Sequence, residues 1–357
     1  MAMSRDRDMT SQLQQAVQQA NDERRHVNIC GAGSKTFYGR QATGTVLDVS
    51  GHRGIIKYEP TELVLTARGG TPLSEIDQAL RQHGQHLAFD PPHFAAGATL
   101  AGTIACGLAG PARPYSGSVR DAVLGVRCLN GRGDVLRFGG EVVKNVAGFD
   151  TARLMVGALG TLGVLLDVSL KVLPIPEAEK TLVFELAEQE ALAQMVRWRR
   201  QSLPITATAY HDGRLTVRLS GVEAGVKAAR RQLGGEKLKH GHAYWEALRE
   251  HHHDFFRREE PLWRISLPGN AAPLKILGKW LFEWGGALRW LRTALQSTII
   301  REIASRAGGH ATLFRGGDRQ GMVFHPPPGP LLELNRRLKA SFDPHGIFNH
   351  GRLYPEF

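Results

Sequence analysis

A loop of small residues near the N-terminus has the composition of a phosphate-binding turn. It reads Gly31-Ala32-Gly33-Ser34-Lys35 and follows a short apolar run, Val27 to Cys30. Successive backbone N–H groups in such a turn can point at a diphosphate, and the Ser34 hydroxyl and Lys35 ammonium add donors. Two familiar motifs are excluded, because Thr36 breaks G-x-G-x-x-G and Ser34 replaces the glycine that precedes the lysine of a P-loop. A plain structural turn is the alternative.

Two further stretches are built mostly from residues with small side chains. A helix that opens within Ala98 to Gly110 would bring its first N–H groups close to a phosphate without steric hindrance. Gly157 to Val164 holds three glycines before a strand, in a turn flat enough to lie against a purine. Close helix packing and a tight turn are the structural alternatives. Together the three stretches predict a site for a dinucleotide diphosphate outside any Rossmann unit.

Two arginines are candidate ligands for an anionic substrate. Arg264 and Arg289 lie in short, apolar, strand-like segments. A guanidinium can clamp a carboxylate and orient it for reaction. Alternation along a strand equally allows either arginine to face solvent.

Five histidines are close together in the sequence without the spacing of a metal site. His240, His242, His251, His252 and His253 do not form H-E-x-x-H, and adjacent side chains on a helix point in different directions. We expect a polar surface there and no metal site.

Short apolar runs between glycine turns predict a chain with many strands and few helices. Val123 to Leu129 and Val135 to Phe138 flank Asn130-Gly131, which predicts a hairpin with a tight turn. Leu73 to His83 is periodic and predicts a helix capped by Thr71. This mixture is typical of an α+β fold and not of a doubly wound parallel sheet.

The length and the changes in composition predict more than one domain. A chain of 357 residues is too long for one ordinary core. Glycine is dense up to about residue 175, whereas charge, Trp and His increase after it. A proline run, Pro326 to Pro328, precedes the last segment. We therefore expect a division into 1–175, 176–330 and 331–357.

The charge and the cysteines limit the classes of partner. The formal net charge of +11 fits a basic solvated surface, an acidic partner subunit or an anionic membrane surface, and these stay open. No nucleic-acid-binding motif is present. Cys30, Cys106 and Cys128 include no C-x-x-C pair, which excludes a four-cysteine iron–sulfur or zinc site made by this chain alone. Sparse cysteines and the lack of a signal peptide predict a cytoplasmic location.

Several stretches, taken in order and spacing, resemble one family. The sequence is similar to the PCMH-type FAD-binding domain of the vanillyl-alcohol oxidase superfamily, and past about residue 25 it resembles the FAD-binding subunits of bacterial glycolate oxidases. The stretches that carry the resemblance are Gly31–Lys35, Pro91–Gly107, Ser116–Asp121, Gly139–Gly148, Gly160–Val164, Trp284–Trp290 and Phe342–Arg352.

The resemblance implies a fold and a cofactor site. Residues 1–175 would form an FAD-binding domain of two subdomains, 176–330 a smaller antiparallel-sheet cap on the substrate side, and 331–357 a segment that returns to the FAD domain. The residues implied to contact FAD are Gly31, Ala32, Gly33, Ser34 and Lys35 at the pyrophosphate, Thr99, Gly102, Cys106 and Gly107 between diphosphate and flavin, Gly160, Thr161, Gly163 and Val164 at the adenosine half, and Asn349 and Arg352 near the flavin ring. The first loop lacks the histidine of covalently flavinylated members, so we expect non-covalent FAD.

The resemblance also implies a reaction. An FAD-dependent oxidoreductase of this kind would act on the CH–OH group of a small 2-hydroxy acid and convert glycolate to glyoxylate. Such chemistry needs a base for the hydroxyl proton and a cationic clamp for the carboxylate. Arg264, Arg289 and His310 are the candidate catalytic residues. Catalytic relatives carry G-H-x-G-D-G-N-L-H, of which Gly309 to Phe314 keeps only the first histidine.

The partial motif leads to a hypothesis about partners. Glycolate would be oxidised mainly on a homologous catalytic FAD subunit, and electrons would leave through an iron–sulfur subunit. Two alternatives stay open: a stand-alone oxidase for another 2-hydroxy acid or a sugar, and a non-catalytic assembly subunit. Peripheral association with the inner face of the cell membrane is also left open.

Overall fold

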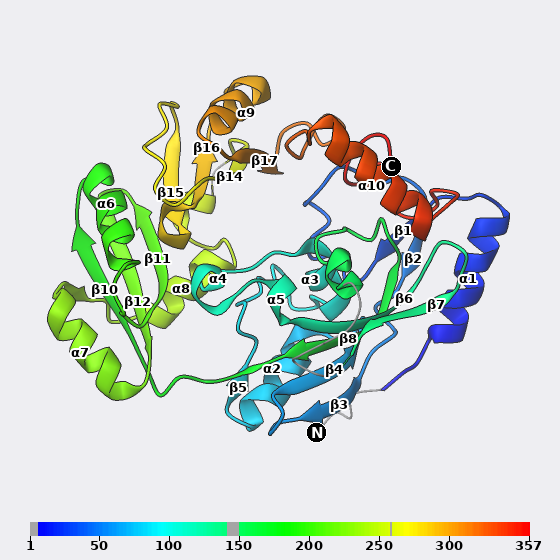
Figure 1. Cartoon of the computed structure of the whole chain (residues 1–357), viewed down its shortest axis with the longest axis horizontal. Helices are drawn as coiled ribbons and strands as arrows, with labels where there is room; N and C mark the ends of the chain where they lie inside the picture. The colour runs from blue at the N-terminus through cyan, green and yellow to red at the C-terminus, as the bar shows by residue number, and fades with distance from the viewer. Residues whose placement is uncertain (1–5, 141–149, 258) are drawn as a thin grey trace. The chain divides into compact units, whose positions relative to one another are not determined.

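The chain forms two compact units in a computed structural model that describes residues 6–140, 150–257 and 259–357 (Figure 1). The first unit comprises Met1–Leu108, Ser118–Pro174 and Arg319–Phe357, and the second comprises Ala109–Gly117 and Ile175–Asp318. These units differ from the expected division in two ways. The second unit ends at residue 318 instead of 330, and it includes residues 109–117. Whether the units fold as independent domains stays a prediction.

The first unit is built on a five-stranded antiparallel sheet. Its strands, in spatial order, are β3 (Ile55–Glu59), β4 (Val64–Arg68), β8 (Val164–Lys171), β6 (Val123–Leu129) and β7 (Val135–Gly139). Two small sheets accompany it, a parallel pair β1 (Val27–Cys30) with β2 (Thr45–Asp48) and an antiparallel pair β5 (Gln85–His86) with β9 (Leu173–Pro174). Strand β8 lies between β4 and β6 in the sheet, and its side chains are buried along nearly its whole length.

The helices of the first unit pack against these sheets. They are α1 (Thr10–Asp22), α2 (Leu73–Gln82), α3 (Leu100–Cys106), α5 (Val119–Ala122), the 3-10 turn η1 (Thr151–Met155) and α10 (Gly329–Phe342). Helix α1 buries Leu13 and Val17, spaced four apart on one face, in a cluster that also contains Val27 and Phe348. Phe348 pairs with Val27 in a parallel bridge, so the C-terminal segment is part of this core.

The second unit contains one large antiparallel sheet. Its strands, in spatial order, are β13 (Glu236–Lys237), β10 (Ala178–Glu185), β12 (Arg214–Gly221), β11 (Ile205–His211), β15 (Lys279–Glu283), β16 (Leu288–Arg292), β14 (Leu262–Ser266) and β17 (His310–Arg315). Its helices are α4 (Arg113–Ser116), α6 (Glu188–Trp198), α7 (Glu223–Leu233), α8 (Gly241–Arg249) and α9 (Ser297–Arg306), with the 3-10 turns η2 (Asp254–Phe256) and η3 (Trp284–Gly286). The predicted α+β class is confirmed.

Two local predictions are wrong, and in both a polar side chain is the reason. No two-residue turn forms at Asn130, because its Oδ1 accepts the N–H groups of Arg132 and Asp134 and organises a longer loop, residues 130–134. Thr71 does not cap α2, because its hydroxyl bonds instead to the backbone of Gly54. Pro72 takes the N-cap position, and the helix begins at Leu73.

Candidate functional site

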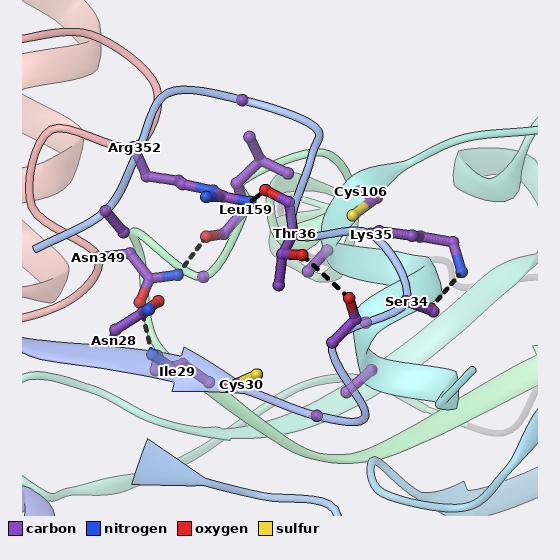
Figure 2. Close-up of a pocket in the computed structure, with 18 of the residues that line it drawn as sticks. Asn28, Ile29, Cys30, Ser34, Lys35, Thr36, Cys106, Leu159, Asn349 and Arg352 are labelled. Atoms are coloured by element: carbon purple, nitrogen blue, oxygen red, sulfur yellow. Dashed lines mark hydrogen bonds between the residues drawn. The ribbon is translucent and has the colours of Figure 1, made fainter. Parts of the chain in front are cut away.

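A cavity of about 440 Å³ lies within the first unit. That volume is within the range of sites that hold cofactors and other small ligands. Its lining includes the loop after β1, the start of α3, the turn around Gly160, and the C-terminal segment with Asn349 and Arg352. Figure 2 shows side chains from these stretches arranged around the cavity. The three glycine-rich stretches therefore converge on one site.

The loop after β1 approaches the start of α3 too closely for any residue but glycine. A Cβ on Gly31 would lie 2.5 Å from the Oγ1 atom of Thr99. Thr99 caps α3, because this same oxygen accepts the N–H of Gly102. Glycine at 31 thus lets the loop backbone pass directly over the first turn of the helix.

Asn349 joins strand β1 to the turn around Gly160. Its Oδ1 accepts the N–H of Ile29 at 2.7 Å, and its Nδ2 donates to the carbonyl of Leu159 at 2.6 Å (Figure 2). A Cβ on Gly160 would lie 2.6 Å from that Nδ2, and Gly160 has a φ of +76°. Only glycine satisfies both conditions without strain.

The lining of the cavity is positively charged. It includes Lys35, Arg319 and Arg352, and among the described residues that line it there is no Asp or Glu. Burial lowers the pKa of Arg319 to about 10, and the neighbouring Arg352 adds to this shift. Burial raises the pKa of the Cys106 thiol to about 11, so this thiol is neutral at pH 7. The cavity therefore fits an anionic ligand.

Most of the residues expected to contact FAD line this cavity. Those that do are Gly31, Ala32, Gly33, Ser34, Lys35, Thr99, Gly102, Cys106, Gly160, Gly163, Asn349 and Arg352. Arg319 also lines it and was not anticipated from the sequence. No local motif marks Arg319, since its contacts are with residues about 280 positions away. The contacts of all these residues with the cofactor stay predictions.

Three expected residues lie outside the lining and have structural contacts. Gly107 ends α3 in a left-handed conformation, with a φ of +62°. Thr161 is buried, its hydroxyl donates to the carbonyl of Ala158, and its own carbonyl accepts from Lys339. Val164 is fully buried in the core cluster that contains α1. Their contacts with an adenosine or a flavin also stay predictions.

The two candidate arginines of the second unit lie on opposite faces of its sheet. Arg264 on β14 pairs with Trp290 on β16, whereas Arg289 pairs with Ile265. Directly paired residues share a face, and adjacent residues along a strand alternate. Arg264 and Arg289 therefore cannot hold the same carboxylate from this sheet.

Arg289 is fully buried, and its side chain forms hydrogen bonds with backbone carbonyl groups. Its guanidinium donates to the carbonyls of Gly286 at 3.1 Å, Ala272 at 2.7 Å and Ala271. Its side chain has no solvent exposure, and burial lowers its pKa. This environment favours a structural role over substrate binding.

Arg264 is half-buried and lies over an aromatic ring. Its guanidinium carbon is 5.1 Å from the centroid of the Trp284 ring, and that of Arg113 is 4.6 Å from the same centroid. Arg113 belongs to residues 109–117, the stretch that the structure includes in the second unit. Two guanidinium groups thus converge on one indole.

His310 shares a face of the sheet with Arg264. It is exposed at the first position of β17 and pairs with Ser266, and the next position on that face, Thr312, pairs with Arg264. Because side chains alternate along a strand, His310 and Thr312, the partner of Arg264, lie on the same face of the sheet. The catalytic roles of Arg264, Arg289 and His310 stay predictions.

The prediction that the clustered histidines form a polar surface is wrong for His251. His251 is buried and stacks on Phe256, with ring centroids 3.8 Å apart. Burial lowers its pKa well below the usual value, so it is neutral at pH 7. Among the residues that the structure describes, no group of His, Cys, Asp or Glu could hold a metal ion.

Comparisons with known proteins agree with the geometry of the cavity. A family described as "FAD binding domain" matches residues 8–139. The chain is 50% identical over 354 residues to "Glycolate oxidase subunit GlcE" of Escherichia coli (strain K12), which covers 99% of this chain and 100% of that protein. It is 31% identical over 169 residues to "Glycolate oxidase subunit GlcD" of Bacillus subtilis (strain 168), which covers 47% of this chain and 35% of that protein.

The fold also has a counterpart among solved structures. An alkyldihydroxyacetonephosphate synthase superposes with a TM-score of 0.65 at 15% identity, which covers 95% of this chain and 74% of that one. At this identity the likeness supports the fold alone. In the part of the chain that is described, no helix is long and apolar enough to cross a membrane. The family match and the cationic cavity identify FAD as the cofactor.

Proposed function

The chain belongs to the family of GlcE subunits of glycolate oxidase, and from that premise we propose that it is the FAD-binding subunit of a complex that oxidises glycolate to glyoxylate. The observation that carries this proposal is the 50% identity to a glycolate oxidase subunit over nearly the whole of both chains. A match of that extent includes the residues of the second unit, on the expected substrate side, as well as the FAD-binding stretches.

The residues of the first unit would hold FAD by its diphosphate. Lys35, Arg319 and Arg352 supply positive charge, and the close approach of Gly31 to Thr99 supplies a bare backbone. When bound, FAD supplies the hydride acceptor for oxidation of the α-carbon of a 2-hydroxy acid. The protein then has to orient the substrate carboxylate and take a proton from its hydroxyl.

Arg264 is the better of the two candidate arginines for the carboxylate. It is half-buried, and Arg113 lies against the same Trp284 ring, so two positive charges are close together there. His310 shares the face of Arg264 and is exposed, and an imidazole is a common general base for a hydroxyl proton. Arg289 is fully buried and bonded to three carbonyls, so we assign it to structure.

Electrons from the flavin need an acceptor outside this chain. The sequence has three cysteines, and Cys30, Cys106 and Cys128 are free thiols. Four thiolates are the usual ligand set of an iron–sulfur cluster. We therefore propose that a partner iron–sulfur subunit takes the electrons and that a homologous FAD subunit carries most of the glycolate oxidation.

Dye reduction by the isolated chain tests the division of labour. The full chain, loaded with FAD, would be compared with the complex purified with its partner subunits, at equal flavin concentration. We expect glycolate-dependent dye reduction by the chain alone to be below about 1% of that by the complex, because Gly309 to Phe314 keeps only the first histidine of the motif of catalytic relatives. A hundredfold difference in rate corresponds to about 2.7 kcal/mol in activation free energy. Brisk reduction by the chain alone would contradict the proposal and favour a stand-alone oxidase. Failure of the isolated chain to take up FAD would favour a non-catalytic assembly subunit.

A further inference from the structure

Three arginines join the C-terminal segment to the loop that follows the expected phosphate-binding turn. Arg319 donates through Nη2 to the carbonyls of Phe37, at 2.6 Å, and Gly39. Arg352 donates to the carbonyls of Thr36 at 3.0 Å, Tyr38 at 2.6 Å and Arg40 at 2.8 Å. Five consecutive carbonyls, residues 36–40, therefore accept hydrogen bonds from two guanidinium groups. We call Arg40, Arg319 and Arg352 the arginine clasp.

Arg40 completes the clasp in the opposite direction. Its Nε donates to the carbonyl of Gly351 at 2.8 Å, and its Nη1 donates to the carbonyls of Gln320 and Gly321. Its backbone N–H also donates to the carbonyl of Arg352 at 2.9 Å. The loop and the C-terminal segment thus fix each other through side chains and backbone from both sides.

The clasp changes what residues 36–40 offer to an anion. A carbonyl oxygen carries partial negative charge and would repel a phosphate. Here the carbonyls of residues 36–40 are aimed at guanidinium groups, and Arg319 and Arg352 themselves line the cavity. The lining at this point therefore carries net positive charge.

The positive charges of the clasp are close enough to repel each other. Burial and the proximity of Arg352 both lower the pKa of Arg319, and burial lowers the pKa of Arg352. Within the part of the chain that the structure describes, no Asp or Glu lines the cavity. An anion with two negative charges inside the cavity would offset this repulsion.

We propose that Arg319 and Arg352 hold residues 36–40 in the shape that receives the diphosphate of the dinucleotide and supply positive charge to it, so that Arg352 would lie at the diphosphate and not, as the resemblance implies, near the flavin ring. Arg319 acts both as a charge and as a positioning residue for the loop. The chemical class of ligand that this part of the cavity selects is a nucleotide diphosphate, in preference to an uncharged flavin or nucleoside. The inference rests on FAD as the cofactor and is independent of glycolate as the substrate.

Titration of the apo full chain with FAD, ADP and riboflavin tests the proposal. The variants are Arg319→Gln, which removes the charge, and Arg319→Lys, which keeps it but cannot make the same pair of carbonyl bonds. Arg337→Gln is the matched control, since Arg337 is exposed on α10. Binding would be measured by calorimetry over a series of salt concentrations, without any assay of enzyme activity.

We expect R319Q to weaken FAD and ADP binding about tenfold or more, the size expected for losing a charge-assisted hydrogen bond. Riboflavin binding should change by less than about twofold, since riboflavin has no phosphate. The salt dependence of FAD binding should flatten in R319Q and be retained in R319K, with R319K intermediate in affinity.

Two results would overturn the proposal. One is FAD affinity in R319Q that equals that of R337Q. The other is a loss of the same factor for FAD and riboflavin, which would indicate a general collapse of the loop. If R319Q does not fold, the test rests on R319K. An FAD affinity of R319K that does not change with salt concentration would contradict recognition by charge.

Discussion

The cavity of the first unit and the sheet of the second unit carry candidate residues in different ways. In the first unit, stretches separated by more than 300 residues contribute to one lining, in which glycine turns and the cationic side chains of Lys35, Arg319 and Arg352 come together. In the second unit, two arginines that look equivalent in the sequence lie on opposite faces of one sheet. A binding site made of turns can therefore be predicted from the sequence without knowing the direction of each side chain. A site made of side chains on strands cannot, because the direction decides which face of the sheet each residue occupies.

Replacing Arg289 should have the largest effect on stability and no direct effect on the cofactor. Arg289→Met keeps the length of the side chain but removes the donors for the carbonyls of Gly286, Ala271 and Ala272. We expect a loss of about 3 kcal/mol in the free energy of unfolding, because buried acceptors lose their partners. Urea unfolding would measure it, with Arg306→Met on the exposed surface of α9 as the control.

The opposite pattern for Arg289 would break the comparison between the two units. If R289M were as stable as R306M but raised the KM for glycolate in the complex, Arg289 would be a substrate ligand after all.

A methyl group on Gly31 should have the largest effect on the cavity. In Gly31→Ala the new Cβ meets Thr99 Oγ1 at 2.5 Å, so the loop or the start of α3 has to move. We expect the Kd for FAD to rise about tenfold or more, in line with the 1–3 kcal/mol typical of overpacking. Gly225→Ala is the control, because a Cβ there meets nothing within 4 Å. Equal FAD affinity in both variants would mean that the loop does not contact the cofactor.

Changing the amide of Asn349 to a carboxyl should weaken the cofactor site in a pH-dependent way. Asn349→Asp keeps the acceptor for Ile29 but puts an oxygen against the carbonyl of Leu159 and adds negative charge to the lining. We expect FAD affinity at pH 8 to fall by about tenfold. The loss should shrink as the pH falls toward 5, because burial raises a carboxyl pKa and protonation restores a donor.

Titration of Asn349→Asp with FAD at pH 5 and pH 8 measures this effect. Asn335→Asp on α10 is the control, because the side chain of Asn335 makes only an exposed hydrogen bond to its own helix. A pH-independent loss in the Asn349 variant would show that Asn349 acts only through general packing.

Replacing Arg264 should have the smallest effect on folding. Arg264 is half-buried over Trp284, and a contact of this kind contributes about 0.5–1 kcal/mol. We expect Arg264→Gln to change the free energy of unfolding by less than about 1 kcal/mol while it raises the KM for glycolate in the complex. A loss of stability as large as that of R289M would make the two arginines equivalent and remove the contrast between the faces.

The sequence predicted the turns of the cavity because glycine itself marks them, even where its cause is a tertiary contact, as with Gly31 and Thr99. Gly31 is required by a close approach, and Gly33 and Gly160 by a positive φ, and such needs are visible in composition and spacing. Arg319 could not be predicted, because its partners Phe37 and Gly39 come together with it only through the tertiary fold.

The sequence also could not predict which face of the sheet each arginine occupies. Arg264 and Arg289 are both in apolar runs, and a shift of one residue in the register would exchange their environments. His251 illustrates a related limit: Phe256, on which its ring stacks, is only five residues away, but Trp290 and Phe314 join the cluster only through the tertiary fold.

Release of flavin from the purified full chain tests most directly whether the first unit holds FAD without a covalent bond. The chain would be precipitated with acid, and flavin would be measured by absorbance in the supernatant and in the washed pellet. A cavity with cationic side chains and bare backbone predicts about one FAD per chain in the supernatant and none in the pellet. Flavin retained in the pellet would contradict non-covalent binding, and a chain that takes up no FAD even when it is supplied in excess would contradict the assignment of the cavity.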